Sequence, residues 1–169
     1  EKSIFILYGD HYGISANHND AMEKFLGREI NAYEHIQLQR VPLIIHIPGM
    51  TGETISKVSG QVDVRPTLLY LLGIEGENPY DFGENMFADN PDPMIVLRDG
   101  SFITKDYVYT ENACYRKGFI GTEADAENCE PYKERAQEDL SYSDKIIYGD
   151  LMRFSDVIEK KPNPSDRLP

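Results

Sequence analysis

The sequence is short of several features that define common protein classes. It has no tryptophan, only two cysteines and no apolar run long enough to cross a bilayer, so we expect no transmembrane segment. Its start shows no signal-peptide pattern. Neither of the usual phosphate-binding glycine motifs, GxxxxGK(S/T) and GxGxxG, occurs, and nothing therefore supports a nucleotide-binding fold.

Positive charge is also scarce. The 17 Lys and Arg residues are outnumbered by 29 Asp and Glu residues, which gives a formal net charge of −12 at pH 7. Nucleic acids and anionic membrane surfaces both attract basic proteins, so we expect neither as a direct partner. Apolar residues make up 40% and charged residues 27% of the 169 residues, which indicates a soluble globular domain with a sizeable core.

The most informative feature is an acidic residue and a histidine at the end of an apolar run. Residues 4–8 are continuously apolar, which predicts a strand buried on both faces, and Gly9, Asp10 and His11 follow directly. Ligands of open α/β sheets bind outside the carboxyl ends of the strands. A carboxylate and an imidazole there suit a divalent cation. The alternative is that Asp10 caps a turn and that His11 is a satisfied polar residue.

Other polar residues near this pair are weaker candidates. His18 could be a third ligand, but a helix-capping or surface histidine is the simpler interpretation. His46 interrupts the apolar run at residues 41–47, where a satisfied core histidine is expected. Ser15 lacks the Gly-x-Ser-x-Gly context of a nucleophile, and its hydroxyl is instead suited to donate a hydrogen bond to a substrate oxygen.

Asp10 and His11 cannot complete a metal site by themselves. A divalent ion bound by protein takes three or four protein ligands, so the others must come from elsewhere. A strand buried on both faces also needs neighbours on both edges, and the remaining sequence supplies few such strands. We therefore expect the chain to be the C-terminal part of a larger α/β protein.

Periodicity and turn residues divide the chain into residues 1–90 and residues 91–169. The first region is predicted to hold parallel-type strands with helices, and the second a small antiparallel sheet packed by a long helix. The expected strands are residues 4–8, 41–47, 94–97, 101–104 and 107–109, and the expected helices are residues 21–26, 31–38, 66–72 and 130–154.

Local signals refine some of these elements. Asp99 and Gly100 predict a primed hairpin turn, and residues 111–112 are expected to turn the chain again. Asp63 is the expected N-cap of the helix that ends at Leu72. Leucines surround nearly the whole circumference of that helix, which predicts that it is buried.

The two cysteines, Cys114 and Cys129, are separated by fourteen residues of polar, glycine-containing sequence. A disulfide closing a loop of this size stabilises a protein by roughly 3 kcal/mol in the chain-entropy model. The spacing excludes a CxxC metal knuckle. The alternative is two unrelated thiols. If the cysteines are bridged, the protein resides in an oxidising compartment.

Several segments together resemble the lipoteichoic acid synthases, which belong to the sulfatase branch of the alkaline phosphatase superfamily. The resemblance spans nearly the whole chain and is most specific around the Asp10-His11 pair. The matching segments are residues 8–15, 17–19, 22–24, 41–49, 60–63, 66–69, 73–74, 99–104 and 149–154, with Phe87. The resemblance implies the C-terminal portion of an alkaline-phosphatase/sulfatase-like α/β sandwich.

The resemblance also implies an activity. Members of the family transfer glycerol phosphate from phosphatidylglycerol to a growing lipoteichoic acid chain, with a threonine nucleophile and Mn²⁺ or Mg²⁺. It implies that Asp10 and His11 are metal ligands and that Ser15 contacts the phosphatidylglycerol head group. The nucleophile lies upstream in the family, so no residue here is assigned as catalytic, and the upstream part of the same catalytic domain is the expected partner.

The resemblance places the chain at the extracellular face of the membrane of a Gram-positive bacterium, or released from it by proteolysis. Other members of the superfamily remain alternatives: a sulfatase, a phosphoethanolamine transferase or a lipoteichoic acid primase. A different class of explanation is a non-catalytic extracellular fragment or an acidic binding module. The residue at the nucleophile position would separate the enzymes, since a threonine favours phosphoryl transfer and a formylglycine marks a sulfatase.

Overall fold

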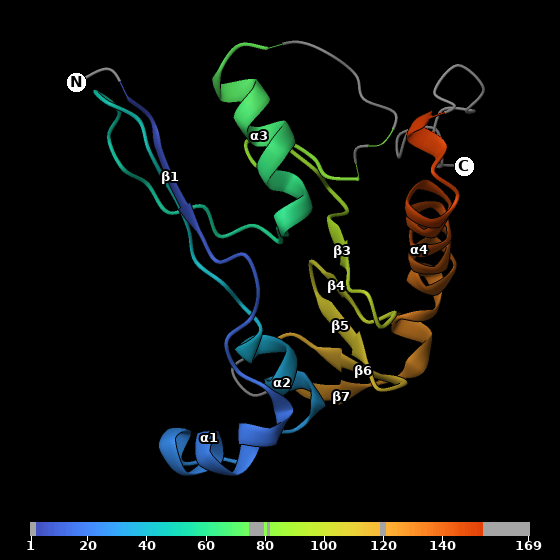
Figure 1. The fold of residues 1–169 in the computed structure, drawn as a ribbon. Helices are drawn as coiled ribbons and strands as arrows, with labels where there is room; N and C mark the ends of the chain where they lie inside the picture. Colours follow the sequence, from blue (N-terminus) through green and yellow to red (C-terminus); the bar gives the residue numbers. More distant parts are fainter. Residues whose placement is uncertain (1–2, 75–79, 81, 119–120, 154–169) are drawn as a thin grey trace.

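A computed structural model describes residues 3–74, 80, 82–118 and 121–153, and its centre is a five-stranded antiparallel meander (Figure 1). Each strand pairs with the next one along the chain, in the order β3-β4-β5-β6-β7. The strands are β3 (Met94–Val96), β4 (Phe102–Thr104), β5 (Tyr107–Thr110), β6 (Ala113–Arg116) and β7 (Thr122–Ala124). The antiparallel sheet expected after residue 90 is confirmed, with β6 and β7 as two strands that the sequence pattern did not predict.

Helix α4 (Glu130–Tyr148) packs against one face of this sheet. Phe102 is fully buried there, and its ring stacks on Tyr109 and meets Tyr132 of the helix at a centroid distance of 6.1 Å. Ala136, one turn further along the helix, is also buried. The long helix over the sheet is therefore confirmed, although it ends at Tyr148, before the expected residue 154, because Gly149 interrupts it.

The opposite face of the sheet is covered by helix α2 (Ala32–Leu38). Tyr33 and Ile36 pack against Val108, which is fully buried. The hydroxyl of Tyr33 also donates a hydrogen bond of 2.7 Å to the carbonyl of Gly118. This helix comes from the region before residue 90, so the two sequence regions share a core; the division into residues 1–90 and 91–169 stays a prediction.

The turn expected at residues 111–112 is confirmed, but the type of turn expected at Asp99 and Gly100 is wrong. At Asp99 and Gly100 only the glycine has a positive φ, of 88°, so the loop is not a primed turn but a three-residue loop with a left-handed final residue. The primed geometry occurs instead at Glu111 and Asn112, whose φ values are 49° and 62°. Two positive φ values are the signature of a type I′ turn, and this turn joins β5 directly to β6.

Strands β1 (Phe5–Tyr8) and β2 (Leu43–His46) form a separate two-stranded ribbon that extends away from the meander (Figure 1). They are antiparallel, so the expected parallel arrangement is wrong for this pair. The expected burial on both faces is also absent within the described residues: all four residues of β1 are exposed, including Leu7 at 59%. The apolar residues of β1 lie on both faces of the ribbon, and no other segment in the described part of the chain covers either face.

The remaining helices are short. They are α1 (Asn19–Leu26), α3 (Val64–Leu71) and the 3₁₀ turns η1 (Ala16–His18), η2 (Gln61–Asp63) and η3 (Ala126–Asn128). The helices at residues 21–26, 31–38 and 66–72 are thus confirmed with small shifts. Helix α3 is not buried as expected, since Thr67 is its only fully buried residue in the described structure and Tyr70 is 61% exposed. Among the described residues, no helix has both the length and the apolar character to cross a membrane.

The disulfide between Cys114 and Cys129 is present, with their Cα atoms 5.9 Å apart. Both cysteines are buried in the cluster that also contains Phe102 and Ala136. The bond ties β6 to the N-terminus of α4, so it fixes the helix to the sheet face that the helix covers. The expectation of paired cysteines is confirmed.

Replacing both cysteines by alanine should lower the free energy of unfolding by about 3 kcal/mol, because the unfolded chain then loses a closed loop of fifteen residues. Urea unfolding followed by circular dichroism measures the change. The native protein in the presence of a reductant should unfold at the same urea concentration as the variant. Equal urea midpoints for the variant and the oxidised native protein would contradict a stabilising role of the disulfide.

Candidate functional site

Asp10 and His11 lie immediately after β1, at the position the sequence predicts. The N–H of Gly9, the residue before them, donates a hydrogen bond of 3.0 Å to the carbonyl of Pro42. A Cβ atom at residue 9 would lie 2.6 Å from the Cβ of Val41, so only glycine allows the two chains to approach this closely. The apolar run therefore ends at a glycine because the ribbon is tightest there.

The two side chains of the pair face one another. The Nε2 atom of His11 lies 3.8 Å from Oδ1 of Asp10, and both side chains are largely exposed. The Nδ1 atom of His11 is 2.7 Å from the carbonyl oxygen of Tyr12. Since a carbonyl only accepts, Nδ1 is the donor in this bond, and Nε2 is the ring nitrogen on the side of Asp10. This is the arrangement in which a histidine commonly serves as a metal ligand.

The spacing of these two atoms suits a shared cation. Zinc-like ions bind nitrogen and oxygen at about 2.0–2.2 Å, so two adjacent ligand atoms on one ion lie about 3–3.5 Å apart. The observed 3.8 Å needs only a small side-chain rotation to match. Within the described residues no group of three or more His, Cys, Asp or Glu side chains comes together. The pair does not form a complete metal site within the described residues, and its role as two metal ligands stays a prediction.

Ser15 starts the turn that follows. Its hydroxyl oxygen accepts a hydrogen bond of 3.3 Å from the N–H of Asn17, and its carbonyl accepts one of 2.9 Å from the N–H of His18. The side chain therefore caps turn η1. Its O–H proton can still be donated, so the assignment of Ser15 to substrate binding stays a prediction.

Two histidines can be compared with their expected roles. His18 occupies the position before α1 without a capping hydrogen bond from its side chain, and it is exposed. His46 is exposed on β2, with its ring 6.1 Å from that of Phe5, so the expectation of a core histidine is wrong. The reason is the same as for β1: the ribbon has no cover within the described residues.

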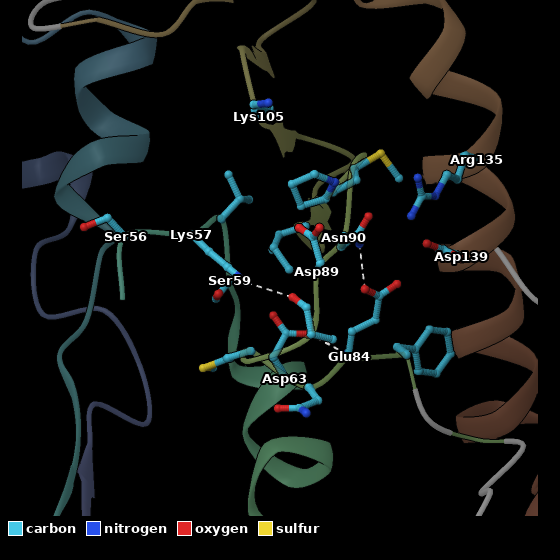
Figure 2. Close-up of a pocket in the computed structure, with 18 of the residues that line it drawn as sticks. Ser56, Lys57, Ser59, Asp63, Glu84, Asp89, Asn90, Lys105, Arg135 and Asp139 are labelled. Carbon is cyan, nitrogen blue, oxygen red and sulfur yellow. Dashed lines mark hydrogen bonds between the residues drawn. The ribbon is translucent and has the colours of Figure 1, made fainter. Parts of the chain in front are cut away.

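A polar pocket of about 340 Å³ lies between residues 56–59 with Asp63 of η2, the segment at residues 82–90, strand β3 and helix α4 (Figure 2). Its walls carry both charges, since Lys57, Lys105 and Arg135 line it together with Glu84 and Asp139. Two of the cations already bind protein oxygens: Lys57 donates to the carbonyl of Ala88 at 2.8 Å and Arg135 pairs with Asp92 at 3.2 Å. The mixed charge indicates no particular class of ligand. No sequence motif marks this pocket, because its residues come from distant segments.

Asp63 is the buried carboxylate of this pocket. Its two oxygens accept hydrogen bonds of 2.8 Å from the N–H groups of Gly60 and Glu84, so it fastens the segment after residue 82 to the start of η2. Burial raises the pKa of Asp63 above its usual value, and the two N–H groups act in the opposite direction. Asp63 precedes α3 as expected, but its side chain makes no capping bond to that helix.

Relatives of known name match nearly the whole chain. It is 54% identical over 160 residues to the lipoteichoic acid synthase-like YvgJ of Bacillus subtilis. The aligned region is 92% of this chain and 26% of YvgJ. The chain is 43% identical to lipoteichoic acid synthase 2 of Bacillus subtilis and 41% identical to the lipoteichoic acid synthase of Staphylococcus aureus, each over 98% of this chain and 26% of the relative. The chain is a homologue of the C-terminal part of the lipoteichoic acid synthases.

The expected resemblance is therefore confirmed. The chain spans about a quarter of the length of the curated relatives that it matches. No family model matches it. The mixed α/β structure, with its antiparallel sheet and long helix, agrees with the C-terminal region of lipoteichoic acid synthases.

The raised pKa of Asp63 predicts a pH-dependent stability. A carboxyl whose pKa is higher in the folded than in the unfolded state stabilises the fold below its unfolded pKa, and this contribution is lost as the pH rises through the folded pKa. Asp63→Asn removes the titration and one acceptor, so it should destabilise by about 1–3 kcal/mol. The gap in thermal midpoint between the native protein and the variant should narrow from pH 4 to pH 7. A gap that widens over this range would contradict the direction of the shift.

Proposed function

We propose that this chain is the C-terminal part of a metal-dependent phosphoglycerol transferase that makes lipoteichoic acid. In the complete enzyme, glycerol phosphate passes from phosphatidylglycerol to the growing polymer. The observation that carries the proposal is the Asp10-His11 pair, whose facing Oδ1 and Nε2 atoms lie 3.8 Å apart in a chain homologous to lipoteichoic acid synthases.

The chemistry of a phosphodiester fits this donor set. Bound Mn²⁺ or Mg²⁺ would offset the negative charge on the nonbridging oxygens of the phosphate. Asp10 supplies a hard, charged oxygen, and His11 offers Nε2 as the second donor atom while its Nδ1 is engaged by the carbonyl of Tyr12. In this proposal the hydroxyl of Ser15, four residues after His11, donates a hydrogen bond to an oxygen of the head group. The nucleophile and the other ligands come from the preceding part of the enzyme.

The surface of the ribbon supports that preceding part as a partner. Side chains on both faces are apolar and exposed, with Phe5 at 49% and Leu7 at 59% on one face and Ile6 at 37% and Tyr8 at 53% on the other. An exposed apolar surface on a small two-stranded sheet is costly in water, and such surfaces mark places where another part of a protein packs. The ribbon also leads directly to Asp10 and His11, so packing there would bring further ligands to the pair.

The site of action is inferred from the relatives and the disulfide. Lipoteichoic acid synthases of Bacillus subtilis and Staphylococcus aureus are among the matches, and their names point to the envelope of Gram-positive cells. A buried disulfide is typical of proteins outside the cytosol. Both observations support a location at the extracellular face of the membrane.

Replacing either Asp10 or His11 by alanine in the complete enzyme should abolish metal-dependent turnover, because one lost ligand displaces the cation from the phosphate. Bound Mn²⁺ measured by elemental analysis, together with release of diacylglycerol from phosphatidylglycerol, tests both parts of this expectation. Asp20→Ala is the matched control, since Asp20 is an exposed carboxylate on α1, outside the proposed site and the ribbon. Normal turnover and metal content in Asp10→Ala or His11→Ala would remove the basis of the proposal.

The proposed packing of the ribbon can be tested with two separately expressed pieces of the enzyme. The chain and the preceding segment should purify together, and Leu7→Glu should prevent this because it places a charge on the apolar face. Thr122→Glu, on the exposed outer strand β7, is the control and should leave the association intact. Unchanged co-purification of the Leu7→Glu chain would show that the ribbon is not the contact surface.

A further inference from the structure

Gln61 lies far from the Asp10-His11 pair in sequence but reaches the residue just before it. Its Nε2 atom donates a hydrogen bond of 2.6 Å to the carbonyl oxygen of Gly9, across 52 positions of the chain. We propose that Gln61 is a positioning residue that sets the orientation of Asp10 for metal binding. This inference rests on the proposed function, in which Asp10 is a metal ligand.

The geometry of the peptide bond explains how this contact can act. The carbonyl of Gly9 belongs to the same rigid plane as the N–H and Cα of Asp10. A hydrogen bond to that oxygen therefore restrains rotation of the plane from which the Asp10 side chain projects. On the other side of Gly9, its own N–H is held by the carbonyl of Pro42 at 3.0 Å. Both peptide planes that flank Gly9 are thus fixed.

Gln61 is itself held firmly at its base. It is the first residue of η2, and the neighbouring Gly60 and Asp63 bind each other twice: the N–H of Asp63 donates to the carbonyl of Gly60 at 3.0 Å, and the N–H of Gly60 donates to the Asp63 carboxylate at 2.8 Å. The second carboxylate oxygen of Asp63 binds the N–H of Glu84. A side chain on a rigid turn loses less freedom when it makes a contact, so the bond to Gly9 is well suited to positioning.

The hydrogen bond between Gln61 and Gly9 joins two separate segments of the sequence that resemble the family, residues 8–15 and residues 60–63. The ribbon carries the pair of ligands, and η2 with α3 carries the turn anchored by Asp63. The side chain of Gln61 links this turn to the ribbon at Gly9, the residue before Asp10. Removal of its amide donor should therefore affect the ligand geometry more than the fold.

The test is Gln61→Met in the complete enzyme, since methionine keeps the length of the side chain and removes the donor. The dissociation constant for Mn²⁺, measured by calorimetry, should rise about 10-fold, at the lower end of the effects seen for residues that orient metal ligands. Turnover should recover at saturating Mn²⁺, and the thermal midpoint without metal should stay close to that of the native enzyme. Gln61→Asn, which keeps the polarity but is too short to reach Gly9, should behave in the same way.

Gln137→Met is the matched control, because Gln137 is exposed on α4 and far along the chain from the ribbon. An unchanged Mn²⁺ constant in both Gln61 variants would overturn the inference. So would a loss of turnover that added Mn²⁺ does not restore, since that result indicates a structural role. Asp10→Ala separates this failure from a failure of the proposed function: if Asp10→Ala also binds Mn²⁺ normally, Asp10 is not a ligand at all.

Discussion

The alternation of side chains along β5 is the constraint on which the compact part of the structure depends. Successive residues of a strand point to opposite faces, so Tyr109 meets Phe102 and the α4 side, whereas Val108 meets Tyr33 and the α2 side. A shift of one residue in the pairing would exchange both sets. The type I′ turn after β5 fixes the register with β6, and the disulfide from β6 then fixes α4.

The proposed metal ligands lie outside this compact part, at the end of an uncovered ribbon. Helix α2 connects the two, because it packs on the meander while Gln39, the residue after its end, donates to the carbonyl of Ile14 in the loop beyond His11. Gln61 holds the same segment at Gly9. The ligands are therefore restrained by backbone contacts on both sides, although their own side chains are exposed. A site of this kind can be completed by another part of the protein without rebuilding its frame.

The sequence predicted the elements better than their surroundings. Helix α2 begins after Asn31, within one residue of its expected start, because capping is a local property, whereas α4 ends at Gly149, before its expected end. The primed turn was expected at Asp99-Gly100 but occurs at Glu111-Asn112, since the pairing of β5 with β6, and not the residue type alone, determines which loop has two positive φ values. The burial expected for β1 and α3 was inferred from their apolar composition. Composition indicates that a surface favours contact with other apolar groups, but it does not identify the segment that makes the contact.

By itself, the sequence determined the pair of candidate ligands, the cysteine pair and the antiparallel meander with its helix, because each of these depends on neighbouring residues or on a short period. Only the tertiary structure decided the antiparallel direction of β1 and β2, the mixed-charge pocket around Asp63 and the contact of Gln61 with Gly9. The physical reason is the same in each case. These features join segments separated by tens of residues, and chain folding, not local preference, selects which of them meet.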